Sequence, residues 1–117
     1  MELKHITECF NDLGYQVQHE TKKVVGYKAP KTRRVAYLRK DSGLPARARI
    51  VIDPDYNPDS IFALDGIKRP KTQYQHGSNM EMLPKRRNKG ENEIPYGIAV
   101  DAVTLDGLAR ALRTYDV

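Results

Sequence analysis

The hydrophobic residues near the start of the chain are spaced as on one face of a helix. They recur every three or four positions between residues 2 and 13, which is typical of an amphipathic α-helix. Gly14 follows directly and suits the position just after a helix C-terminus. We therefore predict a helix over residues 2–13. The hydrophobic positions are Leu3, Ile6, Phe10 and Leu13.

The same spacing returns at the other end of the chain and predicts a second helix over residues 103–114. Asp101 or Thr104 is the expected N-cap residue. Gly107 weakens such a helix by roughly 1 kcal/mol relative to alanine, and close packing against a sheet would explain a glycine there. The hydrophobic positions of this helix are Leu105, Leu108 and Leu112, and we expect them to be buried together with Leu3, Ile6 and Phe10.

Short hydrophobic or alternating segments between the helices predict β-strands. The connections between the first four are short, and this favours an antiparallel meander. The chain is therefore predicted to have an α+β fold. It would contain an antiparallel sheet of four to five strands, with the N- and C-terminal helices packed on one face. The predicted strands are residues 15–18, 24–27, 33–38, 48–52 and 94–100, with a short helical turn near 60–64.

Residues 66–93 do not follow either pattern. The segment is mostly polar and rich in Lys, Arg, Asn and Gly. We interpret it as a long basic loop within a single domain of residues 1–117, and loops of this length are usually functional or disordered. Three hydrophobic residues, Met80, Met82 and Leu83, are expected to attach its middle to the body of the protein.

Basic residues are concentrated in two parts of the chain. The net charge of the 117 residues is +5, but residues 22–49 alone hold ten basic residues and one acidic residue. Residues 68–89 hold seven basic residues and one acidic residue. Such asymmetry predicts a positive surface directed at a polyanion or an acidic protein, although well-solvated surface strands are an alternative.

Several classes of protein lack support in the sequence. There is one cysteine, Cys9, which fits a reducing compartment, and we expect a cytoplasmic protein with no signal peptide and no membrane span. The three histidines are far apart, so no metal site is expected, and no glycine-rich phosphate loop predicts a cofactor. The sequence therefore favours a non-catalytic binding module over an enzyme.

A metal-dependent nuclease is the enzymatic alternative. Asp53 could meet Glu91 or Glu93 in space, with Lys85 nearby. The chain lacks the acid–spacer–acid–x–Lys order expected of such sites, so we regard this as the third hypothesis.

The order of elements resembles the YgaC-like family of small bacterial cytoplasmic proteins. The resemblance covers most of the chain through short hydrophobic motifs, and it implies an α+β fold and a cytoplasmic location without implying catalytic residues. The matching residues are Leu13-Gly14-Tyr15, Gly26-Tyr27, Val35 to Arg39, Ile50 to Pro54 and Tyr96-Gly97-Ile98. A second stretch is similar to small domains near restriction and other DNA-defence genes. It consists of Ser78-Asn79-Met80, Leu83 to Arg86, Gly90 and Tyr96-Gly97-Ile98.

These observations lead to a nucleic-acid-binding accessory domain as the first hypothesis, with DNA favoured over RNA. Basic side chains neutralise phosphates, and nearby tyrosines can stack on unpaired bases. Asn79, Gln75 or Arg87 could reach base edges. The alternative is an interaction module or small inhibitor that docks an acidic protein; the oligomeric state is open. The expected phosphate contacts are Lys85, Arg86, Arg87 and Lys89, extended by Arg33, Arg34, Arg39 and Lys40.

Overall fold

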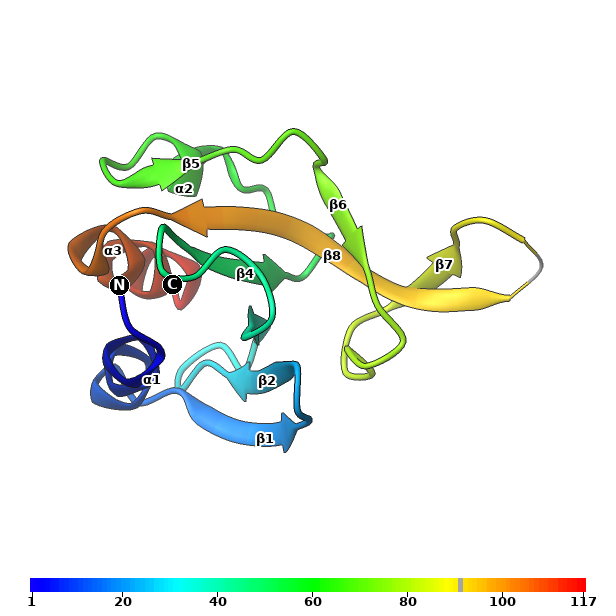
Figure 1. The fold of residues 1–117 in the computed structure, drawn as a ribbon, viewed down its shortest axis with the longest axis horizontal. Coiled ribbons are helices and arrows are strands. Elements are labelled where there is room, and N and C mark those ends of the chain that lie inside the picture. Colours follow the sequence, from blue (N-terminus) through cyan, green and yellow to red (C-terminus); the bar gives the residue numbers. More distant parts are fainter. Residues whose placement is uncertain (91) are drawn as a thin grey trace.

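An antiparallel sheet of eight strands forms the centre of the protein (Figure 1). The computed structural model describes residues 1–90 and 92–117, and this part of the chain also contains three helices. The helices are α1 (Leu3–Asp12), α2 (Asp59–Phe62) and α3 (Leu105–Tyr115). The strands are β1 (Gln16–Glu20), β2 (Val24–Lys28), β3 (Val35–Arg39), β4 (Ala48–Ile52), β5 (Ile67–Lys68), β6 (Tyr74–His76), β7 (Lys85–Arg87) and β8 (Glu93–Ala102).

Strand β8 organises the sheet because it is at least twice as long as each of the strands that pair with it. The strand order is β1-β2-β3-β4-β8-β5, and β6 and β7 also pair with β8. The half of β8 nearer the C-terminus pairs with β4, from Ile98 to Ala102. The half nearer the N-terminus extends beyond the meander of β1 to β4 and forms a hairpin with β7 (Figure 1). We call strands β6, β7 and residues 93–98 of β8 the projection.

The prediction of four to five strands was wrong. All five predicted strands are present, but β5, β6 and β7 lie within residues 66–93, which we expected to form a loop. Each of them has only two or three residues. A segment this short cannot show a period-two pattern, so its strand conformation comes from pairing with β8.

All three helices pack on one face of the sheet, where the larger hydrophobic core lies. Ile6 and Phe10 of α1 and Leu108 and Leu112 of α3 are fully buried there. The Phe10 ring stacks on Tyr27 at 4.1 Å between ring centroids. Alternate residues of the central strands complete this core, as expected for a sheet with period-two side chains. They include Val25, Tyr27, Ala36, Leu38, Ile50, Ile52, Ile98 and Val100.

Two positions predicted to be buried, Leu3 and Leu105, are partly exposed, and so is Val17 of the first strand. Leu3 and Leu105 are each 37% exposed, because they lie in the first turns of their helices, at the ends of the hydrophobic stripes. Val17 is 49% exposed because β1 is an edge strand with an irregular register after this residue. Edge strands have only one neighbour and are less covered than central ones.

The segment between β6 and β7 covers the opposite face of the sheet. Met80 and Leu83 are buried there against Val24, Tyr37 and Val51, and Met82 packs beside them. The Tyr37 hydroxyl accepts a hydrogen bond from the Met82 backbone N–H at 3.2 Å. The expectation that these hydrophobic residues attach the segment to the body is confirmed.

Of the two N-cap candidates, Thr104 caps α3, since its hydroxyl accepts a hydrogen bond from Gly107 N–H at 2.9 Å. Asp101 instead lies in β8, three residues before the cap. A side chain at Gly107 would meet the Gly66 carbonyl oxygen at 2.8 Å. The glycine is therefore explained by close packing against the segment that leads into β5.

Candidate nucleic-acid interface

The projection exposes side chains of β6 and β7 on either edge of β8. Gly77 N–H donates to the Pro95 carbonyl at 3.0 Å, and Tyr96 N–H donates to the Pro84 carbonyl at 2.9 Å. Backbone groups of adjacent strand residues point to opposite edges. The segments flanking β6 and β7 therefore bind β8 from its two sides, and three short pieces of chain form one small platform.

A cluster of one cation and three aromatic rings lies on one face of this platform. The Arg86 guanidinium is 4.4 Å from the centroid of the Tyr74 ring and 4.2 Å from that of Tyr96. The His76 ring stacks on Tyr96, with ring centroids 5.7 Å apart. Arg86 Nε donates a hydrogen bond to His76 Nε2 at 3.1 Å. We call these four half-exposed residues the Arg86 cluster.

The electrostatics of the cluster keep His76 neutral. Burial and the neighbouring Arg86 guanidinium lower the pKa of His76 below its ordinary value of 6.5. Nε2 must carry no proton to accept the hydrogen bond from Arg86, so the neutral ring holds its proton on Nδ1. Arg86, in β7, is thereby connected across β8 to a residue of β6.

Acidification is expected to break this connection. Because the pKa of His76 is lowered in the folded protein, the unfolded chain binds more protons between that pKa and 6.5, and stability falls as the pH drops through this window. An NMR titration of His76 should give a pKa below 6.5, and Arg86→Ala should raise it. Arg87→Ala, on the opposite face of the same strand, is the control and should leave it unchanged. A pKa at or above 6.5 in the wild-type protein would contradict this account.

The other basic residues of the predicted interface lie on the same hairpin. Lys85 and Arg87 flank Arg86 in β7, and both are exposed. Strand side chains alternate between faces, so these two lie on the face opposite the Arg86 cluster. Lys89 is exposed in the turn that follows β7. The structure thus brings Lys85, Arg86, Arg87 and Lys89 together on one projecting element.

The basic residues of the first segment are mostly engaged in contacts within the protein. Arg34 donates to the carbonyls of Tyr115 and Val117 at 2.6 and 2.8 Å. Arg39 pairs with Asp41 at 3.2 Å, and Lys40 pairs with Glu20 at 3.0 Å. Arg33 is exposed and directly follows the turn formed by Ala29 to Thr32, with a backbone φ of 64°. Its Nη1 lies 3.5 Å from the side-chain amide oxygen of Gln16. Arg34, Arg39 and Lys40 therefore contact other parts of the folded protein, whereas Arg33 stays exposed.

Asn79 and the tyrosines fall into two groups, one in the folded body of the protein and one in the Arg86 cluster. Asn79 lies beside Gly77 in the segment that covers the second face, close to Arg39. Tyr27 and Tyr37 are fully buried, so neither can stack on a base. Tyr74 and Tyr96 are half-exposed and belong to the Arg86 cluster. Sequence position beside a basic segment did not distinguish the buried pair from the exposed pair.

The residues considered for a nuclease site are separated in the structure. Ile52, the last residue of β4 and the one directly before Asp53, pairs with Ile98 of β8. Glu93 lies five residues away from Ile98 along β8, a distance of roughly 16 Å. The Asp53 carboxylate accepts a hydrogen bond from the Asp55 backbone at 2.9 Å. Glu91 lies outside the described residues. Within residues 1–90 and 92–117, no group of three or more His, Cys, Asp or Glu side chains could hold a metal ion.

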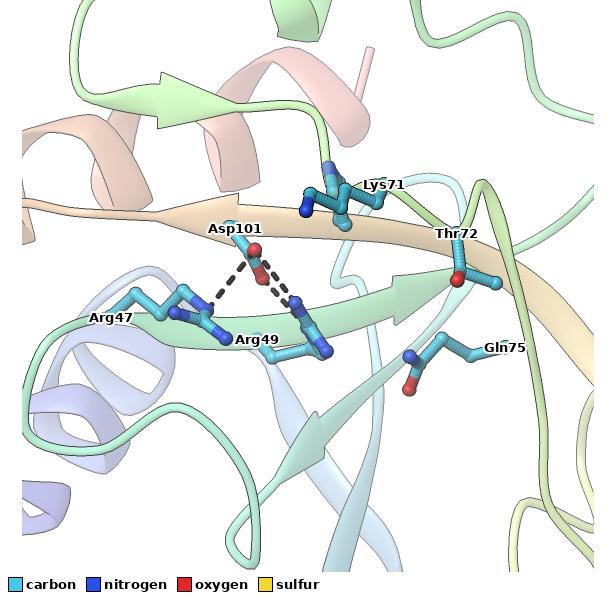
Figure 2. Close-up of a pocket in the computed structure, with 7 residues that line it drawn as sticks. Arg47, Arg49, Lys71, Thr72, Gln75 and Asp101 are labelled. Atoms are coloured by element: carbon cyan, nitrogen blue, oxygen red, sulfur yellow. Dashed lines mark hydrogen bonds and ion pairs between the residues drawn. The ribbon is translucent and has the colours of Figure 1, made fainter.

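A cationic cavity that we did not predict opens at the other end of β8 (Figure 2). It has a volume of about 360 Å³. Asp101 lies at its base and is 7% exposed; its carboxylate accepts two hydrogen bonds from Arg49, at 2.8 Å each. Arg47 Nε lies 3.2 Å from the same carboxylate. Lys71, Thr72, Gln75 and Pro70 complete the lining.

One signal in the sequence could have indicated this cavity. Asp101 interrupts the hydrophobic run from Ile98 to Ala102, and a buried carboxylate requires a cationic partner. The Asp101 carboxylate in turn raises the pKa of Arg49, which keeps that guanidinium charged. Asp101 also lies close enough to the start of the C-terminal helix to suit an N-cap, an interpretation that requires no cationic partner.

The comparisons with known proteins leave the family open. No family model, curated protein or solved structure matches the chain. The resemblance to the YgaC-like family stays a prediction. Across the part of the chain that the structure covers, no helix is both long enough and apolar enough to span a lipid bilayer.

Proposed function

We propose that the protein binds nucleic acid without acting on it chemically, and that the projection is the contact surface. The observation that carries the proposal is the position of Arg86, held between Tyr74 and Tyr96 on a hairpin that also carries Lys85, Arg87 and Lys89. Cations neutralise phosphates, while aromatic rings and guanidinium planes stack on unpaired bases. Both kinds of group occur together here.

Single-stranded nucleic acid is the form that suits this surface best. The Arg86 cluster is half-exposed and its groups are planar, which supports contact with splayed bases. Lys85 and Arg87 are exposed on the opposite face of the same strand, and Lys89 is exposed in the turn after it, so they can contact the phosphates of a strand that wraps around the hairpin. Binding would be mainly electrostatic and of low sequence specificity.

A salt titration of binding to a short single strand tests the proposal. The variant Lys85→Ala/Arg87→Ala/Lys89→Ala should bind more weakly and lose salt dependence, since each phosphate contact on a single strand contributes about −0.7 to the slope of log K against log salt. The matched control, Lys4→Ala/Lys22→Ala/Arg110→Ala, removes the same charge from other exposed positions. It should change binding far less. No binding by the wild-type protein at low salt, or equal losses in both variants, would refute the proposal.

The contribution of the planar Arg86 guanidinium can be separated from the contribution of its charge. Arg86→Lys keeps the positive charge but removes the planar group that lies over Tyr74 and Tyr96. The variant should weaken single-strand binding more than duplex binding while leaving the salt slope nearly unchanged. Equal binding of the single strand by Arg86→Lys and wild type would mean that stacking plays no part.

We also propose a cytoplasmic location. It is supported by Cys9, a free thiol on α1, since cysteines outside reducing compartments are usually paired. Partial burial raises the pKa of this thiol, so it is not activated for chemistry.

A further inference from the structure

The cavity around Asp101 carries more positive than negative charge. Three cationic side chains, Arg47, Arg49 and Lys71, line it together with one carboxylate. Asp101 fixes the Arg49 guanidinium through two hydrogen bonds and forms an ion pair with Arg47, whose Nε lies 3.2 Å away and makes no hydrogen bond within the described residues. After this pairing the cavity keeps a formal excess of two positive charges.

Hydrogen-bond donors of the cavity approach its interior from several elements. Figure 2 shows the two arginines on either side of Asp101, with Gln75 reaching in from β6 and Lys71 from the segment after β5. Among the described residues, none accepts a hydrogen bond from Arg49 Nη1 or from the Arg47 Nη groups. These nitrogens, the Lys71 ammonium and the Thr72 hydroxyl are available to an acceptor.

We propose that this cavity binds the phosphate group of a phosphate monoester. A monoester carries a charge of about −1.5 to −2 at neutral pH and three strong acceptor oxygens, which matches the charge excess and the donors from separate elements. Arginine suits phosphate because its planar fork donates two parallel hydrogen bonds. The cavity volume is at the lower end of the range of about 300–1,000 Å³ for ligand pockets. The attached group is therefore small or lies outside the cavity.

The site is distinct from the Arg86 cluster and from the basic residues of β7, sharing only β6 with the projection, and it does not depend on the proposed function. Gln75 in β6 faces the cavity, while Tyr74 and His76, its neighbours in the same strand, belong to the Arg86 cluster on the other face. The same phosphate chemistry has two sources, a free phosphorylated metabolite or the 5′ end of a nucleic-acid strand. The probes below separate them.

The direct test is an NMR titration of the full chain with inorganic phosphate at constant ionic strength. Signals of Gln75 and of the Arg47 and Arg49 Nε–H groups should shift and saturate at phosphate concentrations up to roughly 10 mM, as expected for a dissociation constant of about 1 mM. Chloride at the same ionic strength should not produce these shifts, and acetate should bind more weakly. Absence of saturable shifts with phosphate, or equal binding of acetate, would overturn the proposal.

Variants separate this site from the projection. Arg47→Ala/Lys71→Ala removes two cations that are more exposed than Arg49 and leaves the Arg49–Asp101 pair intact. It should weaken phosphate binding by roughly tenfold or more. The Lys85→Ala/Arg87→Ala/Lys89→Ala variant should bind phosphate as the wild type does, even if nucleic-acid binding fails altogether. Unchanged phosphate affinity in Arg47→Ala/Lys71→Ala would refute the site.

Two further probes identify the source of the phosphate. A mononucleotide should bind and its nucleoside should not, if the ligand is a free metabolite. A 5′-phosphorylated oligonucleotide should bind more tightly than the 5′-hydroxyl strand, with the difference lost in Arg47→Ala/Lys71→Ala, if the ligand is a strand end. Failure of both phosphorylated probes to exceed their unphosphorylated partners would count against the proposal.

Discussion

Replacing Leu108 with alanine is expected to lower the free energy of unfolding by about 2–5 kcal/mol, the range found when a fully buried leucine is truncated. Leu108 is 0% exposed and lies at the centre of the buried stripe of α3. The neighbouring strands are rigid and hydrogen-bonded, so they cannot fill the resulting space fully. The loss combines the transfer free energy of the removed carbon atoms with the cost of the cavity.

Leu105→Ala is the matched control for Leu108→Ala. Both are leucines of α3 three residues apart, but Leu105 is 37% exposed. Its truncation should cost clearly less, which urea unfolding of both variants would measure. Equal losses would mean that the two side chains are equally buried in solution, and would contradict the packing of α3 described here.

Replacing Met80 with alanine is expected to have a comparable effect, again about 2–5 kcal/mol. Met80 is 0% exposed on the face of the sheet opposite the helices, against Tyr37 and Leu83. The turns around it are fastened by hydrogen bonds from Met80 N–H to the Gly77 carbonyl and from Leu83 N–H to the Met80 carbonyl, both at 3.0 Å. Loss of the side chain should loosen this whole segment.

Hydrogen exchange distinguishes this local effect from a general one. The amides of Met80 and Leu83 should exchange faster in Met80→Ala by a larger factor than the amides of α3 do, because local openings require less free energy than global unfolding. Met82→Ala is the control, since Met82 is only half-buried. A stability loss below about 1 kcal/mol for Met80→Ala would show that the segment is not packed against the sheet.

Attachment of this segment also matters for the proposed interface. Residues 77–84 connect β6 to β7, the two strands that carry Tyr74, His76 and Arg86. The second hydrophobic cluster therefore holds both edges of the projection to the body of the protein. The proposed interface therefore depends on a core that the helices do not reach.

Several features of the fold could be predicted from local sequence patterns. The 3.6-residue spacing of Ile6 and Phe10, and of Leu108 and Leu112, indicated both terminal helices. Five strands were long enough to show hydrophobic character of their own. Met80 and Leu83 were recognisable as anchors because they are isolated hydrophobic residues in a polar segment.

The candidate site was predictable only in part. The basic run from Lys85 to Lys89 is evident in the sequence, and the structure places it on an exposed hairpin. The basic residues of the first segment have the same composition, yet Arg34, Arg39 and Lys40 are committed to partners within the protein. Charge is visible in a sequence, whereas the pairing of a charge is not.

The helices, the main strands and the segregation of charge could be predicted from the sequence, because each follows from neighbouring residues. The three short strands, the Arg86 cluster and the cationic cavity depend on contacts between residues far apart in the chain. Arg49 and Asp101 are 52 positions apart, and Arg86 meets His76 only because β6 and β7 pair with opposite edges of β8. Such contacts depend on strand register, and a shift of one residue would turn each of these side chains to the other face of the sheet.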